Sequence, residues 1–282
     1  MEPIDFETVL EYVRFGIRRT SVFMGLGVNA AGSDAIRSVD LSTHTKLKIV
    51  SDPEDDATLR EYKEEFQRWV IANGLRELHE GFTEYLERLN QACLTISWLA
   101  KRYTSEECDR YHKKFHRDGF PEKFKALRSR FNVSTAHENG LLSLNVARNC
   151  HTHRRGIVGN DDLNTGDELR LSWRVLEIYF VPADGEPILN RYLPPQGVPM
   201  PGGAIESKYI DHFVILKQGQ LIDFSPLQMD EICFFLEEAA SELAVSAVEF
   251  ANSLGVEIRE RAPRQLRAGA GDVAHSTDEL IN

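Results

Sequence analysis

The sequence predicts a mainly α-helical protein: an antiparallel bundle of several helices with a β-hairpin-containing insertion. Apolar residues recur at helical spacing over residues 58–103 and again over about 226–254. Between them, a segment at about 167–224 is rich in β-branched and aromatic residues and carries a Pro/Gly cluster that interrupts any helical pattern. Long amphipathic helices bury their apolar faces against one another, so a bundle is the economical arrangement.

Composition narrows the class of protein further. With 282 residues, 42% of them hydrophobic, the chain can form one large domain or two small ones. A net charge of −11 argues against a surface that grips nucleic acid nonspecifically over many phosphates. The N-terminus is acidic and lacks a long apolar run, so we expect neither a signal peptide nor a membrane span. Four cysteines form no CxxC pair and predict reduced thiols in a cytoplasmic protein: Cys93, Cys108, Cys150 and Cys233.

Residues 1–57 are expected to form an N-terminal helix and an irregular segment. Apolar residues at helical spacing predict a short helix over residues 5–20, with Asp5 as its N-cap. Three glycines and an acidic run predict irregular or weakly β structure from Ser21 to about Asp56.

Residues 58–256 are predicted to form the helical bundle. The apolar pattern of 58–103 fits either one very long helix or two helices joined near Asn73-Gly74. Ser225 and Pro226 are a helix N-cap and first-turn pair, and they predict a helix of about thirty residues. Residues 257–282 lack apolar periodicity for most of their length and are expected to be a mobile tail.

Residues 104–134 are rich in charges and aromatic side chains. His112 and His116 are four residues apart, a spacing that can serve two metal ligands on one helix face. No acid or cysteine stands where it would obviously complete such a site, so we predict no metal. A solvent-exposed face, or a face that touches RNA or a partner, is favoured.

The insertion at about 167–224 is predicted to be an appended element that precedes the last bundle helix. Residues 169–181 fit either a strand or a helix. Residues 213–224 predict two short strands around Gln218-Gly219.

A polar cluster follows an apolar helix stripe at residues 141–158. Leu141, Leu144 and Arg148 fall at near-helical spacing, and two arginines followed by Gly156 are typical of a helix C-terminus. Residues 148–155 contain three arginines, two histidines and no acid, which makes a local basic spot on an acidic chain. Cations that merely neutralise the helix dipole would explain Arg154 and Arg155 equally well.

The motif Arg148-Asn149-x-x-x-His153, with Arg155-Gly156-Ile157-Val158 after it, resembles the signature of HEPN domains (higher eukaryote and prokaryote nucleotide-binding). Catalytic members of that family are metal-independent ribonucleases of toxin modules and antiviral defence, built as helical bundles that usually dimerise so that two motifs face one groove. Two features depart from the pattern. Arg154 follows His153 where many relatives have Asn, and a second imidazole, His151, lies inside the spacing.

The resemblance implies an endoribonuclease without cofactor or metal. Arg148 would bind the scissile phosphate, His153 would exchange a proton with the ribose 2′-hydroxyl, and Asn149 would orient the histidine or the substrate. The product would carry a 2′,3′-cyclic phosphate. His151 lies three residues from Arg148 and is the alternative imidazole; it would also bind substrate, together with Arg154 and Arg155.

Helix geometry adds a condition. Arg148 and His153 point about 140° apart on an ideal helix, so they cannot reach one phosphate from a continuous helix. Either the helix ends or distorts before His153, or a second subunit completes the site, which predicts a homodimer. The competing interpretation is a non-catalytic module that binds a nucleotide, RNA or a protein partner such as an antitoxin or another defence component.

Overall fold

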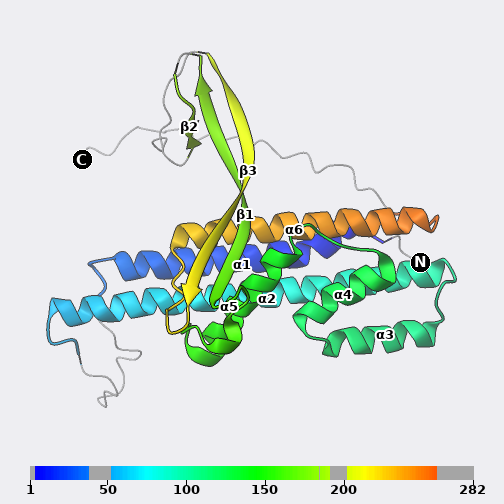
Figure 1. Ribbon diagram of the computed structural model, residues 1–282, viewed down its shortest axis with the longest axis horizontal. Coiled ribbons are helices and arrows are strands. Elements are labelled where there is room, and N and C mark those ends of the chain that lie inside the picture. The colour runs from blue at the N-terminus through cyan, green and yellow to red at the C-terminus, as the bar shows by residue number, and fades with distance from the viewer. Residues whose placement is uncertain (1–3, 38–51, 184, 191–201, 259–282) are drawn as a thin grey trace, which may run out of the picture.

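The computed structural model describes residues 4–37, 52–183, 185–190 and 202–258, and these residues are mainly helical (Figure 1). The predicted mainly α class is confirmed, and the described strands form a small three-stranded antiparallel sheet. The described elements are α1 (Phe6–Gly32), α2 (Asp56–Leu99), α3 (Ser105–Arg117), α4 (Phe120–Phe131), α5 (Glu138–Arg154), a short 3₁₀ turn (Asn160–Asp162), β1 (Glu168–Pro182), β2 (Ile188–Leu189), β3 (Gly203–Lys217) and α6 (Pro226–Ser253).

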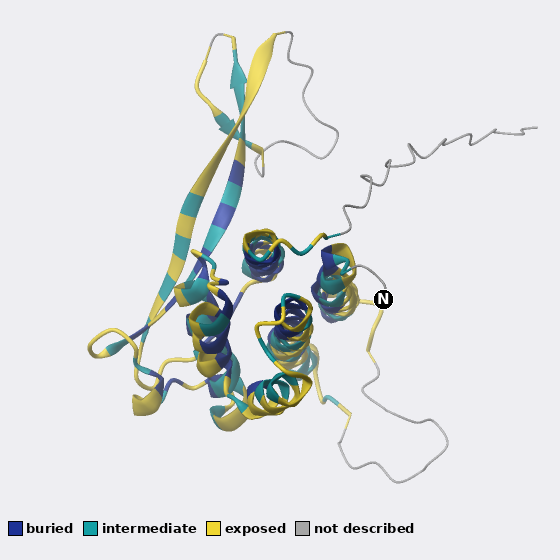
Figure 2. Ribbon diagram, turned by 90° about the vertical axis from the view of Figure 1, so that its right-hand side faces the viewer, coloured by how far each residue is buried: buried dark blue, intermediate teal, exposed yellow. Residues whose placement is uncertain are grey.

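The long helices α1, α2 and α6 lie side by side, with α1 antiparallel to the other two (Figure 1, Figure 2). α1 and α2 approach closely where Gly16 faces Gly81: a Cβ atom on either glycine would lie 3.3 Å from the Cα of the other. At Gly74, an added Cβ would collide with the side chain of Met24. These glycines serve helix packing, and residues 56–99 form one continuous helix rather than two.

α1 is longer than predicted, because it continues through Gly25 and Gly27 to Gly32. The prediction of irregular structure is therefore wrong for residues 21–32. At Gly27 an added Cβ would lie 2.8 Å from the methyl groups of Val70 on α2, so tertiary packing requires this glycine inside the helix. The part of the predicted irregular segment at 38–51 lies outside the described residues.

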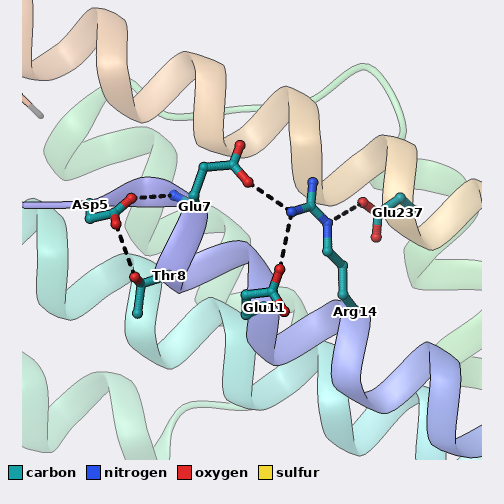
Figure 3. Close-up of polar contacts among 6 residues, drawn as sticks. All are labelled: Asp5, Glu7, Thr8, Glu11, Arg14 and Glu237. Carbon is teal, nitrogen blue, oxygen red and sulfur yellow. Dashed lines mark hydrogen bonds and ion pairs between the residues drawn. The ribbon is translucent and has the colours of Figure 1, made fainter. Parts of the chain in front are cut away.

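Arg14 links α1 to α6 through a group of carboxylates (Figure 3). Its Nε atom donates to Glu237 of α6 at 2.7 Å, and its Nη1 atom contacts Glu7 at 2.8 Å and Glu11 at 3.4 Å. The hydrogen bond to Glu237 is the largest cause that raises the pKa of Arg14. The predicted N-cap of this helix is confirmed, since Asp5 accepts a hydrogen bond from the Glu7 amide at 3.0 Å.

α6 begins as the sequence predicts. Ser225 accepts from the Gln228 amide at 3.2 Å while the Gln228 side chain accepts from the Ser225 amide at 2.8 Å, which closes a capping box. The helix is 28 residues long, close to the predicted thirty. It is fixed to α2 by the hydroxyl of Tyr85, which donates to the Ala240 carbonyl at 2.6 Å. Most of the predicted tail, residues 259–282, lies outside the described residues.

β1 and β3 form a long antiparallel hairpin that projects from the helices (Figure 1). Burial decreases along it: the root lies against the helices, and at the far end β1 is half-buried and β3 is exposed (Figure 2). At the root, buried side chains alternate along β1, and Trp173 donates from Nε1 to Glu231 of α6 at 3.0 Å. The described residues of the insertion supply no α-helix. Its root nevertheless belongs to the protein core through Leu169, Leu171, Trp173 and Val175.

The hairpin predicted around Gln218-Gly219 is wrong. A turn does occur there, with Gly219 at φ 83°, but the chain beyond it leaves the sheet. It pairs instead with the segment that follows α5, through bonds from the Val158 amide to the Gln220 carbonyl at 2.9 Å and from the Ile222 amide to the Gly156 carbonyl at 2.8 Å. β3 pairs with β1 across the whole of both strands, a partner that local sequence does not specify. Most of the Pro/Gly cluster, residues 194–201, lies outside the described residues.

The four cysteines are free thiols, as predicted. Burial raises the pKa of Cys150 and of Cys233 to about 11, which keeps both protonated at neutral pH. Among the described residues, no helix has a stretch that is both long and apolar enough to cross a membrane.

Candidate functional site

A cavity of about 980 Å³ opens between α2, α3, α4 and α5, and we call it the α2–α5 cavity. Its lining is mostly polar and charged. The acids in it are paired with bases, as in the contacts of Glu84 with Arg88 at 3.5 Å and of Asp118 with Lys114 at 2.8 Å. The lining residues that bear on chemistry are His79, His112, His116, Asn145, Arg148 and Asn149.

Arg148 of α5 reaches this cavity without a neutralising acid. Its Nη1 atom donates to the side-chain oxygen of Asn149 at 2.9 Å. Its Nε atom is buried and has no hydrogen-bond partner within the described part of the chain, and no described carboxylate forms an ion pair with it. The guanidinium therefore has N–H groups that can donate hydrogen bonds to an anion. Phosphate is an anion that arginine binds well.

His79 of α2 stands at the same end of the cavity. Its ring packs against Phe120 with the centroids 4.3 Å apart, and its Nδ1 atom lies 3.5 Å from the Thr83 hydroxyl. Burial, and then the positive charge of Arg148, lower the pKa of His79 to about 4; interaction with the Asn145 side chain opposes the shift. At neutral pH His79 is therefore an uncharged imidazole, able to accept a proton or a hydrogen bond.

The other end of the cavity is internally neutralised. Glu87 contacts His116 at 3.0 Å and the buried Lys123 at 3.2 Å. Burial would raise the pKa of Glu87, but these two bonds outweigh it and lower the pKa. Within the described residues the His112/His116 pair belongs to no group of three metal-ligating side chains, so it offers no ready metal site. The Nδ1 atom of His112 is buried and has no hydrogen-bond partner among the described residues.

The structure divides the residues that the sequence grouped together. Arg148 and Asn149 line the cavity, whereas His151, His153, Arg154 and Arg155 do not. α5 continues to Arg154, so the alternative in which the helix ends or distorts before His153 is wrong. His153 is exposed and stays a candidate only through a second subunit.

Arg154 has a structural partner. It forms a bidentate ion pair with the buried Asp162, with Nε donating to Oδ2 at 2.9 Å, and Asp162 also accepts from the Gly159 amide at 2.7 Å. This network fixes the segment after α5. Arg155, not the glycine, is the first left-handed residue at the helix end, with φ 55°, and Gly156 follows at φ 83°.

His151 packs at the end of α5, away from the cavity lining. A Cβ added to Gly156 would lie 2.8 Å from its Nδ1 atom. Burial lowers the pKa of His151, and the nearby Asp223 opposes that shift. The space this ring occupies explains why residue 156 is glycine, in addition to its positive φ.

His79 and Asn145 line the cavity although the sequence did not assign them to a site, whereas His112 and His116 had been considered there as a metal pair or an exposed face. His79 borders the apolar stripe of α2 next to Leu78 and looks like a boundary residue in the sequence. Only the packing of α2 against α5 brings it to Arg148. Comparison of the chain with models of known families, with curated proteins and with solved structures finds no match.

Proposed function

We propose that the chain is a metal-independent endoribonuclease of HEPN type, and that its scissile phosphate binds at Arg148 in the α2–α5 cavity. The observation that carries the proposal is the arginine itself: a guanidinium with a buried unpartnered Nε, no acidic partner among the described residues, and a neutral imidazole beside it. These groups suit a substrate that has an anionic group for Arg148 and, close to it, a hydroxyl whose proton the imidazole can accept. The RN-x₃-H motif makes RNA the substrate we favour.

The chemistry follows from the charges. Arg148 would hold the non-bridging phosphate oxygens and stabilise the charge that develops as phosphorus is attacked. Asn149 holds the guanidinium through the 2.9 Å bond to Nη1 and so fixes its direction. His79 would take the proton of the ribose 2′-hydroxyl. The 2′-oxygen would then bond to phosphorus as the bond from phosphorus to the 5′-oxygen breaks. The 5′-oxygen would take its proton from solvent water, giving a 2′,3′-cyclic phosphate and a 5′-hydroxyl.

A bound phosphate would improve His79 as a base. In the free protein the positive charge of Arg148 helps to keep the pKa near 4, which makes the ring a weak base. Pairing Arg148 with an anion cancels that charge and places a negative charge close to the ring. Both changes raise the pKa toward the working range.

His153 is the alternative imidazole, supplied by a second copy of the chain. Its exposure on α5 leaves it accessible to a partner subunit. We propose a homodimer on this ground and on the family resemblance. In this proposal the 148–156 region lies at or beside the interface between the two copies. A role as a toxin or antiviral-defence effector, with an antitoxin or defence partner, belongs to the same proposal.

The test is RNA cleavage by the full chain in EDTA, with structured and single-stranded RNA, scoring fragment ends for cyclic phosphate. Arg148→Ala should lower the rate by about 10²–10³, the usual scale for loss of one transition-state donor. Arg68→Ala, an exposed arginine of α2 outside the cavity lining, is the matched control and should cleave as wild type does. Equal loss in both variants, or none in Arg148→Ala, would move the chemistry away from Arg148.

A non-catalytic binding module is the second candidate. The low pKa of His79 favours it, because a base with a pKa of about 4 transfers protons poorly at neutral pH. In that case wild type would bind RNA or nucleotide without cleaving either, and Arg148→Ala would weaken the binding. Absence of both cleavage and binding would reject the two functions together.

A further inference from the structure

A second polar cluster lies outside the α2–α5 cavity, where the start of α5 meets α6. It consists of His137, Glu238 and Glu242, and one ligand atom from each residue lies within 4.8 Å of the others. Glu238 and Glu242 stand four residues apart on α6 and so share one helix face. His137 is the N-cap residue of α5 and makes no capping hydrogen bond with its side chain.

The imidazole ring of His137 is fixed by packing, but its Nε2 atom makes no hydrogen bond among the described residues. Its side chain is only 2% exposed, and its ring packs edge-on against Phe235 with the centroids 5.2 Å apart. Its Nε2 atom is buried without a hydrogen-bond partner among the described residues, and so is Oε2 of Glu238. Buried polar atoms are expensive to leave unsatisfied. His137 Nε2 lies at ion-pair distance from two carboxylates but makes no hydrogen bond to either, and an ion bound among the three groups would satisfy it.

The spacing fits a metal ion. His137 Nε2 lies 3.2 Å from Glu242 Oε1 and 3.9 Å from Glu238 Oε1. Two donors bound tetrahedrally at the usual 2.0–2.2 Å from one Zn²⁺ ion are about 3.4 Å apart, a value between these two distances. A neutral imidazole and two carboxylates together balance the charge of a divalent cation.

The surroundings hold the carboxylates in place. Glu242 Oε2 accepts from the Thr135 hydroxyl at 2.7 Å and from the Ala136 amide at 3.1 Å, which leaves Oε1 for the cluster. Glu238 interacts with the hydroxyl of Tyr209 on β3, and that carboxylate raises the pKa of Tyr209. Hydrogen bonds behind the ligands are typical of metal sites in proteins.

We infer that His137, Glu238 and Glu242 bind a divalent transition-metal ion, with Zn²⁺ the best match to one imidazole and two carboxylates. Three protein ligands leave at least one coordination position open, and Glu242, with its side chain 40% exposed, marks the side that faces solvent. The ion would join α5 to α6 beside the root of the hairpin. This site is separate from the α2–α5 cavity, whose proposed chemistry needs no metal.

The test uses the full chain stripped with EDTA and dialysed, then titrated with Zn²⁺ by calorimetry and with Co²⁺ by visible absorption. We expect one equivalent to bind and a Co²⁺ spectrum of four- or five-coordination. Glu238→Gln should weaken Zn²⁺ binding by about 100-fold or more, and Thr135→Val, which removes a supporting bond, by about 10-fold.

Glu249→Gln is the matched control, because it removes the same charge from an exposed site on α6 and should bind as wild type does. His137→Gln risks misfolding, since the ring is buried, so the glutamate variant carries the test. Failure of wild type to bind Zn²⁺, Co²⁺ or Mn²⁺, or equal affinity in Glu238→Gln, would overturn the site. The cluster would then be a metal-free contact of His137 with two carboxylates that joins α5 to α6. RNA cleavage is not read in this assay, so its outcome is independent of the proposed function.

Discussion

Arg14 and Arg148 are both partly buried arginines on helices of one core, but their surroundings differ. Arg14 is surrounded by Glu7, Glu11 and Glu237, and it links α1 to α6. Arg148 faces the α2–α5 cavity with only the Asn149 amide group as a partner for Nη1, and its Nε is buried and unpartnered within the described residues. A guanidinium saturated by carboxylates serves the fold. One left with free donors beside a cavity is suited to an external anion.

After the loss expected for Arg148→Ala, the next largest effect concerns the imidazole beside Arg148. His79→Ala should lower RNA cleavage by roughly 10², because it removes the proposed proton acceptor. His153→Ala should be nearly silent if His79 is the base. The measurement is the initial cleavage rate in EDTA for each variant, with circular dichroism to check folding. The reverse order of the two effects would assign proton transfer to His153 and support a site completed by a second subunit.

A second expected effect is on acid stability. His79 has a pKa of about 4 in the folded protein against 6.5 in a model peptide, so the unfolded chain takes up a proton first as the pH falls. This favours unfolding progressively between pH 6.5 and pH 4 and has no effect above that window. The loss should be about 1–3 kcal/mol. Urea unfolding at several pH values should therefore show a shallower pH dependence for His79→Gln than for wild type. Identical curves would contradict the buried, uncharged imidazole.

The smallest expected effects are the changes in stability on removing Arg14 or Arg148. Arg14→Ala should reduce the free energy of unfolding by about 1 kcal/mol or less, since ion pairs with exposed members are weak, and the Arg14 side chain is 34% exposed. It should leave RNA cleavage unchanged. Arg148→Ala should change stability by less than about 0.5 kcal/mol. Urea denaturation of the two variants measures both values, and a larger loss in Arg148→Ala would place Arg148 among the fold-stabilising residues.

Local signals predicted those elements that local sequence determines. The Ser225–Pro226 cap and the apolar stripe after it marked α6 almost to its length, and Asp5 marked the start of α1. The second half of α1 was missed because Gly25, Gly27 and Gly32 look like helix breakers. Gly27 is instead required by contact with Val70, a residue far away in the chain.

The strand pairing and the candidate site both depend on contacts between distant segments, which local sequence does not specify. Strand periodicity does not tell which strand pairs with which, so the predicted turn partner of residues 213–217 was wrong. Arg148 and Asn149 could be selected because an apolar helix leads into them. His79 could not be joined to Arg148, because that pairing exists only once α2 packs against α5.

The contrast between the two arginines is tested most directly by RNA binding without turnover. A fluorescent 2′-O-methyl RNA oligonucleotide lacks the nucleophilic hydroxyl, so its anisotropy reports binding alone. We expect Arg148→Ala to weaken binding by at least about tenfold, the loss of one charged hydrogen-bonding contact, while Arg14→Ala binds as wild type does. Equal affinity of wild type and Arg148→Ala for the oligonucleotide would contradict the claim that the α2–α5 cavity receives an RNA phosphate at Arg148.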